Sequence, residues 1–264
     1  MFLAIDIGNS NVVAGLYLRG EWKEVWRFQT TTEAGSAAYY ANHFSERFLK
    51  SGLRPQQVDQ VVLSSVVPNL NTLFLDLIRQ FFDKEAILVG PHLYPYLDMD
   101  ILRPNEIGTD LVANSVGALS LYQQDCIIVD FGTALTFTTV TRRGEILGVA
   151  IAPGLKTAVY ALFDKTAQLP EVPLELPETP IGKNTAHAIQ SGVLRGYVGL
   201  VTYMVEDIRK EAGSHFIAVA TGGLSAVLHP LQGVFHAVNP NLTLDGLREI
   251  GARVSERTGG KGVI

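Results

Sequence analysis

Two short acidic turns repeat along the chain and have the composition of phosphate- and cation-binding loops. The first reads DIGNSN from Asp6 to Asn11, and the second reads DFGT from Asp130 to Thr133. In each turn a carboxylate ends an apolar run and is followed by glycine and small polar residues. The backbone N–H groups of such a turn attract an anion, and the carboxylate can hold the accompanying Mg²⁺. A single copy is explained as well by an Asx turn in a hairpin, so the repetition is what favours a polyphosphate site.

The segments around the two turns align without gaps. They begin at Phe2 and at Cys126, and four matches within so short a segment indicate an internal duplication. The matched pairs, each 124 positions apart, are Asp6 with Asp130, Gly8 with Gly132, Gly20 with Gly144 and Glu21 with Glu145.

Each copy predicts a β-hairpin followed by a third strand, a helix and a further strand. Residues typical of buried strands follow each acidic turn, and Arg-Gly-Glu supplies a polar turn. Apolar residues at helical spacing come next in both halves. Two such units predict two stacked α/β domains with a cleft between them, divided near residues 119–124. The predicted third strands are Trp22 to Gln29 and Ile146 to Ala152, the helices are Ser36 to Lys50 and Ala186 to Lys210, and the further strands begin at Val58 and His215.

The composition limits the classes of protein to which the chain can belong. With 264 residues, 47% of them hydrophobic and 18% charged, it predicts a globular protein with a large core. The net charge of −5 argues against a nucleic-acid partner. No uncharged apolar run reaches the roughly 18 to 20 residues of a membrane span. The start of the chain does not resemble a signal peptide, and the single Cys126 lies in an apolar run, so we expect a buried thiol and a cytoplasmic location.

Three common sites of phosphate or metal chemistry are excluded by inspection. The only Gly-Lys followed closely by threonine, in PIGKNT, has Pro177 where the P-loop pattern requires glycine. No G-x-G-x-x-G follows a strand, so the dinucleotide-binding fingerprint is missing. The six histidines are scattered and one cysteine makes no cluster, so zinc is unsupported.

A third glycine-rich turn, ATGGLS from Ala220 to Ser225, follows the buried run FIAVA. Adjacent glycines let the backbone approach a flat ligand closely, although a plain strand-to-helix turn has the same composition. In this order and spacing, DIGNSN, DFGTALTFT and ATGGLS resemble the two phosphate motifs and the adenosine motif of the actin/hexokinase/sugar-kinase superfamily. Three further blocks resemble those of the type III pantothenate kinases, and the resemblance spans nearly the whole chain. These blocks are IGTDLVANSVGA from Ile107, LGVAIAPGL from Leu147 and IGKNTAHAIQSGVLRG from Ile181.

The resemblance implies a fold and an activity. The fold is α/β, with duplicated ribonuclease-H-like (actin/hexokinase-type) domains of mixed five-stranded sheets, residues 1–120 and 121–264, and an interdomain cleft. The activity is ATP-dependent phosphorylation of the 4′-hydroxyl of pantothenate, the first step toward coenzyme A, with Mg²⁺ and a monovalent cation, K⁺ or NH₄⁺. The family also implies a homodimer whose interface helps to close the acceptor pocket.

The same resemblance implies roles for individual residues. Asp110 matches the proton acceptor, Asp6 the Mg²⁺ ligand and Asp130 the monovalent-cation ligand. The acceptor-binding positions are Gly108, Thr109, Asp110, Leu111 and Thr185. The ATP-binding positions are Asp6, Ile7, Gly8, Asn9, Ser10, Asn11, Val12, Val13, Gly132, Thr133, Gly222 and Gly223.

Asp110 fits this role on chemical grounds. Phosphoryl transfer needs chiefly positioning and charge neutralisation. A carboxylate with an ordinary pKa of about 4 can accept the alcohol proton late in the transfer, so we expect placement of Asp110 rather than activation. Asp110 also precedes the run LVANSVGALSLY, which predicts that it is the N-cap of a helix.

The chain departs from the family pattern at two acceptor positions. Leu111 stands where the family usually has arginine, and Ile101 stands where it usually has tyrosine. Loss of a guanidinium and a phenol weakens recognition of a carboxylate-bearing acceptor, by about 1.5 to 3 kcal/mol for each charge-assisted bond. Our hypothesis is that Arg103 or a residue of a second subunit supplies the missing charge.

Two alternatives stay open at this point. One is a non-catalytic regulator on the same fold, because the family includes a member described as a transcriptional accessory factor. The acidic balance and the retention of Asp6, Asp110 and Asp130 speak against it. The other is a kinase for a different small alcohol, which Leu111 and Ile101 motivate.

Overall fold

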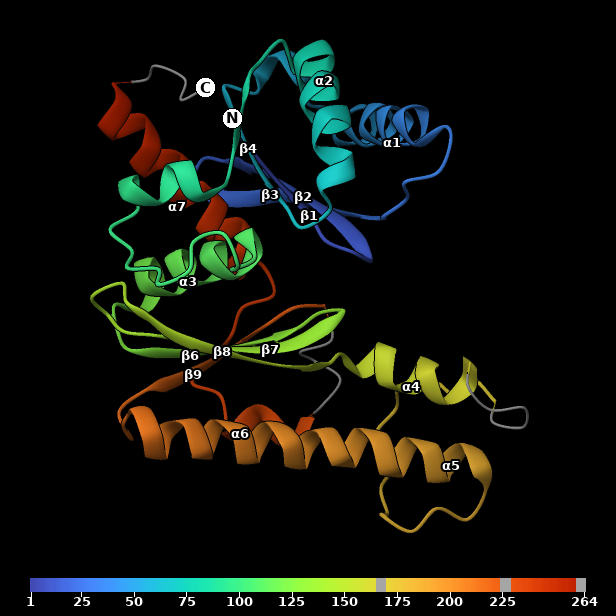
Figure 1. Ribbon diagram of the computed structural model, residues 1–264. Helices are drawn as coiled ribbons and strands as arrows, with labels where there is room; N and C mark the ends of the chain where they lie inside the picture. Colours follow the sequence, from blue (N-terminus) through green and yellow to red (C-terminus); the bar gives the residue numbers. More distant parts are fainter. Residues whose placement is uncertain (165–169, 224–228, 260–264) are drawn as a thin grey trace. The chain divides into compact units, whose positions relative to one another are not determined.

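The first half of the chain begins with three consecutive strands, after which helices and strands alternate. The structure is a computed structural model, and it describes residues 1–164, 170–223 and 229–259 (Figure 1). The strands of this half are β1 (Phe2–Ile7), β2 (Asn11–Leu18), β3 (Glu21–Gln29), β4 (Gln60–Ser65) and β5 (Ala86–Leu88). Its helices are α1 (Ser36–Ser51), α2 (Asn71–Phe82) and α3 (Thr109–Tyr122), and its short 3-10 turns are η1 (Pro55–Gln57), η2 (Pro68–Leu70) and η3 (Pro91–Tyr96).

The second half repeats this plan and adds a final helix. The strands and helices predicted by residue range are confirmed, with bounds that differ by at most two residues, whereas the start of a helix predicted after the ATGGLS turn lies outside the described residues. One predicted helix is divided by a π-helical turn, η4. None of the helices within the described residues is long and apolar enough to cross a membrane. The strands are β6 (Cys126–Phe131), β7 (Ala134–Val140), β8 (Ile146–Pro153), β9 (Ile217–Thr221) and β10 (Ala237–Val238), and the helices are α4 (Leu155–Asp164), α5 (Thr185–Gln190), η4 (Ser191–Arg195), α6 (Gly196–Ala212), η5 (His229–Gly233) and α7 (Leu242–Thr258).

The two five-stranded sheets share one topology. The first has the order β3-β2-β1-β4-β5, and the second has the corresponding order β8-β7-β6-β9-β10. In each sheet the first three strands of the copy pair antiparallel, and the last two add parallel to the first strand. The identical order confirms the internal duplication and the mixed five-stranded sheets.

The ungapped alignment of the two copies is wrong by one residue across the acidic turns. Asp6 pairs with the residue seven positions on, whereas Asp130 pairs with the residue six positions on. The second hairpin tip is therefore one residue shorter than the first. The turn that follows, between the second and third strands, is one residue longer in the second copy, which restores the alignment. Gly20 and Gly144 keep equivalent places there, with φ of 91° and 88°.

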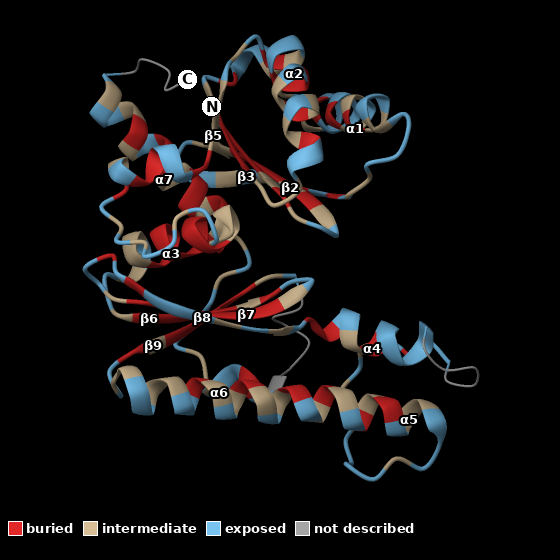
Figure 2. Cartoon of the chain, in the orientation of Figure 1, coloured by how far each residue is buried: buried red, intermediate tan, exposed pale blue. Residues whose placement is uncertain are grey.

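Each face of the first sheet is buried by different helices. Successive strand residues point to opposite faces. Leu3 and Ile5 of β1 therefore join α1 and α2 in one core cluster, while Ala4 joins α3 and α7 in another. In the second sheet, Ile127 and Val129 of β6 pack with α6. Figure 2 shows buried residues along the central strands of both sheets.

The chain divides into two compact units that differ from the predicted domains. Residues 1–121 together with those from 242 onward form unit 1, and residues 122–241 form unit 2. The predicted boundary at 120/121 differs from this division by one residue. The predicted assignment of 242–264 to the second domain differs from the packing, because α7 buries its apolar side chains against the first sheet. Leu247 and Ile250 lie in the cluster that contains Ala4.

Helices α3 and α7 touch backbone to backbone within unit 1. A Cβ atom added to Gly246 of α7 would lie 1.8 Å from the carbonyl oxygen of Ala113 in α3. One added to Gly117 would lie 2.6 Å from the carbonyl oxygen of Leu242. Glycine at both positions lets the two helices approach, and α3 carries Asp110 in its first turn.

Gly246→Ala is expected to lower the free energy of unfolding by about 1–3 kcal/mol, because the added methyl group overpacks the crossing of α3 and α7. Gly199→Ala in α6 is the matched control, since no atom lies within 4 Å of its added Cβ. The better helix propensity of alanine should raise stability there by up to about 1 kcal/mol. Urea unfolding measures both variants, and stabilisation by Gly246→Ala would contradict the close crossing.

Candidate functional site

The first acidic turn is a tight hairpin tip whose backbone is held from two sides. The Gly8 N–H donates to the carbonyl of Asn11 (3.0 Å), and the hydroxyl of Thr30, just after β3, donates to the carbonyl of Gly8 (2.7 Å). The two residues at the tip are exposed, whereas Ile7 and Val12 are buried in the core. Among the predicted ATP-binding positions, Ile7 and Val12 can therefore offer a ligand their backbone groups only.

Asp6 is linked through the neighbouring strand to residues 108–111, the predicted acceptor positions of α3 and its start. It is in register with Ser64 of the parallel strand β4, so both side chains lie on one face of the sheet. The Ser64 hydroxyl lies 2.9 Å from the hydroxyl of Thr109, the first residue of α3. The Thr109 hydroxyl also donates to the carbonyl of Ser65 and accepts from its N–H, each at 3.2 Å. These bonds tie the start of α3, and Asp110 with it, to the strand end beside Asp6.

Asp110 lies inside the first turn of α3, so the prediction that it is the N-cap is wrong. The Gly108 carbonyl accepts the first bond of the helix, from the N–H of Val112 (3.3 Å), which makes Gly108 the N-cap. The bonds of Thr109 to β4 start the helix one residue before the apolar run. A Cβ atom at Gly108 would lie 2.4 Å from Oδ1 of Asp110, so glycine leaves the room that this carboxylate needs.

The pKa of Asp110 is raised, so the expectation of an ordinary value is also wrong. Burial is the largest cause, and it is opposed by hydrogen bonds from the backbone N–H groups of Leu111 (2.9 Å) and of Asp110 itself. A raised pKa makes the carboxylate a stronger base than an exposed aspartate.

The second acidic turn is braced by the segment that follows β8. The Gly132 N–H donates to the carbonyl of Ala134 (3.1 Å). The carbonyl of Thr133 accepts from the Thr157 hydroxyl (2.8 Å) and from the N–H of Gly154 (3.0 Å). A Cβ atom at Gly154 would lie 2.3 Å from the carbonyl oxygen of Gly132. Gly132 and Thr133 are exposed, so their outward groups are accessible to a ligand.

Asp130 lies among hydroxyl groups and beside the third glycine-rich turn. It is in register with Thr136 of β7 on one side and with Thr221 of β9 on the other. Both threonines are buried, and within the described part of the chain their hydroxyl oxygens have no hydrogen-bond partner. Gly222 follows with a φ of 90°, and a Cβ atom there would lie 2.5 Å from Oδ1 of Asp130. Gly223 is exposed, and the last two residues of the ATGGLS turn lie outside the described residues.

Thr185 is an exposed residue at the start of α5. The side chain of Asn184 caps this helix by accepting the N–H of His187 (2.8 Å). The helix belongs to unit 2, whereas the other predicted acceptor positions, 108–111, belong to unit 1.

The two departures from the family pattern lie in apolar surroundings. Leu111 is 8% exposed, and Ile101 packs against the buried cluster that contains Val112. Arg103 is exposed, and its guanidinium donates to the carboxylate of Glu106 (3.1 Å). Its charge is therefore already paired, which weakens the hypothesis that Arg103 replaces the missing arginine.

Sequence reasoning missed the hydroxyl residues that fix these turns. Ser64 and Ser65 end the buried strand in VVLSSV, and a polar pair that closes an apolar run is the signal that points to them. Thr30 and Thr157 carry no such signal, because each lies outside the motifs and reaches its tip only through the fold.

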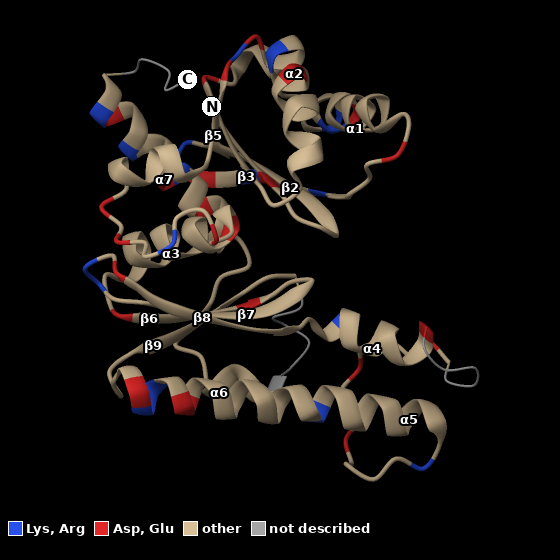
Figure 3. Cartoon of the chain, viewed as in Figure 1, with Lys and Arg blue, Asp and Glu red and all other residues tan. Residues whose placement is uncertain are grey.

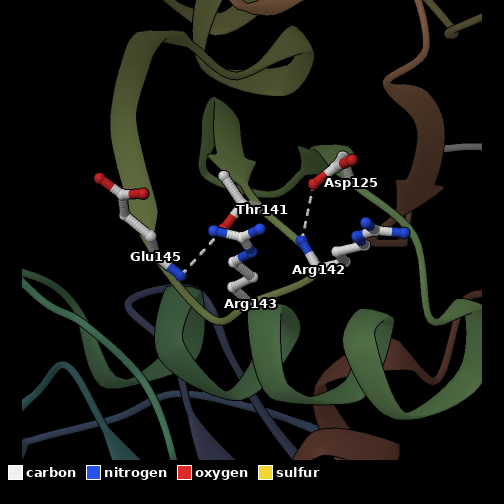
Figure 4. Close-up of a pocket in the computed structure, with 5 residues that line it drawn as sticks. All are labelled: Asp125, Thr141, Arg142, Arg143 and Glu145. Carbon is white, nitrogen blue, oxygen red and sulfur yellow. Dashed lines mark hydrogen bonds between the residues drawn. The ribbon is translucent and has the colours of Figure 1, made fainter.

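A hollow at the far end of the second sheet lies away from these residues. Asp125 precedes β6, whereas Asp130 lies near the end of that strand, so the hollow and Asp130 are at opposite ends of it. The Glu145 N–H donates to the side chain of Thr141 (3.2 Å) within the turn between β7 and β8, and the Arg142 N–H of this turn donates to the carboxylate of Asp125 (2.8 Å). The hollow is lined by Asp125, Thr141, Arg142, Arg143 and Glu145 (Figure 4).

Comparison with known proteins identifies relatives over most of the chain. The family model for type III pantothenate kinase matches residues 2–207. A type III pantothenate kinase from Syntrophotalea carbinolica is 39% identical over 248 residues, which cover 94% of this chain and 97% of that protein. One from Moorella thermoacetica is 38% identical over 253 residues, again covering 94% and 97%.

Solved structures share the fold at lower sequence identity. The activator of 2-hydroxyisocaproyl-CoA dehydratase from Clostridium difficile, with bound ADPNP, matches with a TM-score of 0.57 and 11% identity, over 100% of this chain and 99% of that one. The match confirms the predicted actin/hexokinase-type fold and nothing further. Since the family model covers most of the sequence and the relatives exceed one third identity, the chain belongs to the type III pantothenate kinase family.

Proposed function

We propose that this chain transfers the γ-phosphoryl group of ATP to the 4′-hydroxyl of pantothenate, the first step toward coenzyme A. Its relatives are named for this activity. The observation that carries the proposal is the bond between the hydroxyls of Ser64 and Thr109, because it holds a partly buried carboxylate, Asp110, beside the strand end of Asp6. Phosphoryl transfer depends on such positioning more than on covalent chemistry.

In this reaction the oxygen of the acceptor hydroxyl bonds to the γ-phosphorus of ATP, and ADP leaves. Asp110 accepts the proton that the hydroxyl loses. The first tip offers backbone N–H groups and small polar side chains to the phosphates. Asp6 is the residue of unit 1 that would hold Mg²⁺, which supplies charge neutralisation on the phosphate oxygens when bound. The second tip and the Gly222 turn are the groups of unit 2 that we propose for binding the nucleotide.

A monovalent cation such as K⁺ fits the surroundings of Asp130. Hard cations take oxygen ligands, and here a carboxylate has a buried, unpartnered threonine hydroxyl in register on each side. Across residues 1–164, 170–223 and 229–259, no three or more His, Cys, Asp or Glu side chains come together. A single carboxylate with neutral oxygens suits a singly charged ion, so Asp130, Thr136 and Thr221 are its proposed ligands.

We also propose a homodimer in the cytoplasm. The edge strand β8 exposes Leu147, Val149 and Ile151, and α4 exposes Tyr160 and Phe163, so unit 2 presents a broad apolar surface. Figure 3 shows few charged residues along β8 and from α5 into α6, where the charges gather toward the end of the helix. A second copy of the chain would cover this surface.

A coupled ADP assay with pantothenate, run with and without K⁺, tests the proposed function. Turnover that requires pantothenate supports it. Nucleotide binding without turnover contradicts it and favours the regulatory alternative. Faster turnover of a related hydroxy-amide than of pantothenate assigns the chain to a different alcohol.

Asp110→Asn is expected to reduce kcat by about 100- to 10,000-fold, because the acceptor hydroxyl loses its base while Oδ1 keeps its bond from Leu111. ATP binding should be retained. Asp100→Asn, which makes the same change at an exposed aspartate, is the control and should keep full activity.

The same variant should also be more stable than the wild type at neutral pH. The pKa of Asp110 is higher in the folded than in the unfolded chain, so its ionisation destabilises the fold as the pH rises through the folded pKa. Asparagine removes this penalty, and the difference should vanish below about pH 4, where the aspartate is protonated in both states. Equal pH dependence of the two melting temperatures would contradict the raised pKa.

Replacing both Thr136 and Thr221 by valine should raise the K⁺ concentration required for half-maximal activity by about tenfold or more. The loss of two unpartnered buried hydroxyls should leave the melting temperature without K⁺ equal or higher. Thr138→Val is the control, because its hydroxyl is also buried and unpartnered in the described structure but is in register with Ile128. An unchanged K⁺ requirement, and an unchanged K⁺-dependent thermal shift, would exclude these threonines as ligands.

A further inference from the structure

The hydroxyl of Tyr94 is a buried polar group that the fold leaves unpaired. Tyr94 lies in η3 and is 5% exposed, and its Oη atom has no hydrogen-bond partner in the described structure. Buried hydroxyls are nearly always hydrogen-bonded, because burial removes their bonds to water. Within the described residues, the phenol of Tyr94 is therefore an unsatisfied hydrogen-bond donor.

Packing fixes the Tyr94 ring next to the acceptor motif. The ring belongs to the same buried cluster as Val112 and Ala113, which follow Asp110 in the first turns of α3. Ile107, which precedes the motif, packs against the same cluster. A ring held in this way keeps its hydroxyl in one place, as a binding group requires.

The phenol shares its electrostatic surroundings with the proposed base. Burial, and secondly the charge of Asp110, raise the pKa of Tyr94 to about 12. The hydroxyl is therefore protonated at neutral pH and acts as a hydrogen-bond donor. The hydroxyl is thus a neutral group in the surroundings of the Asp110 carboxylate.

Two arginines of α7 that contact the end of η3 have partners other than Tyr94. Arg253 of α7 donates to the carbonyl of Leu97 (2.6 Å). Arg257, also of α7, forms an ion pair with Asp98. These contacts hold the end of η3 against α7 and do not involve the hydroxyl of Tyr94.

Resting on the proposed function, we propose that Tyr94 is an acceptor-binding residue whose hydroxyl donates a hydrogen bond to an uncharged oxygen of pantothenate, near the hydroxyl that Asp110 deprotonates. The apolar cluster around the ring favours an uncharged oxygen, because it would desolvate a carboxylate without an opposing charge. The reacting end of pantothenate carries hydroxyl and amide oxygens of this kind, whereas its carboxylate lies at the other end. Tyr94 thus contributes to acceptor recognition from outside the motif of residues 108–111.

Tyr94→Phe tests this assignment, since it removes one oxygen and keeps the ring. The KM for pantothenate should rise about three- to tenfold, the value expected for a neutral hydrogen bond, while the KM for ATP stays constant. The melting temperature without ligands should stay equal or rise, because the lost hydroxyl had no partner. Tyr96→Phe, in the same turn and packed against the same cluster, is the control and should change none of these values.

A second acceptor locates the bonded oxygen. Pantetheine keeps the reacting end of pantothenate and lacks its carboxylate, so Tyr94→Phe should impair both acceptors equally. A loss confined to pantothenate would show that the tyrosine binds the carboxylate and would overturn the assignment. An unchanged KM for both, or a lowered melting temperature with equal losses for ATP and acceptor, would also overturn it. Absence of turnover by the wild type would instead overturn the proposed function itself.

Discussion

The hydroxyl of Thr109 makes three hydrogen bonds to the end of β4, and the relation between Asp110 and Asp6 follows from them. Strand β4 is also in register with β1, which carries Asp6. A helix that entered the fold elsewhere would bury Asp110 without placing it near the first tip. The placement of the Asp110 carboxylate therefore rests on the small hydroxyl side chains of Ser64 and Thr109.

The two units use glycine in the same way next to their acidic groups. Gly108 leaves room for the carboxylate of Asp110, and Gly222 leaves room for that of Asp130, in each case where a Cβ atom would lie within 2.5 Å of a carboxylate oxygen. Two bulky neighbours would push these side chains out of place. The two glycines lie in unrelated positions of the two copies, so this likeness is separate from the duplication.

The sequence predicts those features that local patterns determine. Strand and helix periodicity, the two acidic tips and the repeated strand plan are all confirmed, because each depends on residues close together in the chain. The one-residue difference between the two hairpin tips cannot be predicted from local patterns, because strand pairing determines it. The start of α3 at Thr109 cannot be predicted in this way either, because hydrogen bonds to a distant strand determine it. The burial that raises the pKa of Asp110 comes from α3 packing with distant elements, so an ordinary value is the natural expectation from the sequence. The sequence pattern of α7 identifies its apolar face, but it does not indicate which of the two sheets this face covers.

The return of α7 to the first sheet has a consequence for how the protein is made. When residues 1–121 have left the ribosome, every strand of the first sheet has been made. Helix α7, which helps to bury Ala4 and Val62, has not yet been made. Unit 2, a continuous stretch of chain, can complete its own core earlier than unit 1. The face of the first sheet that carries Ala4 and Val62 therefore lacks the part of its cover that α7 supplies until residues 242–258 have been made, after the whole of unit 2.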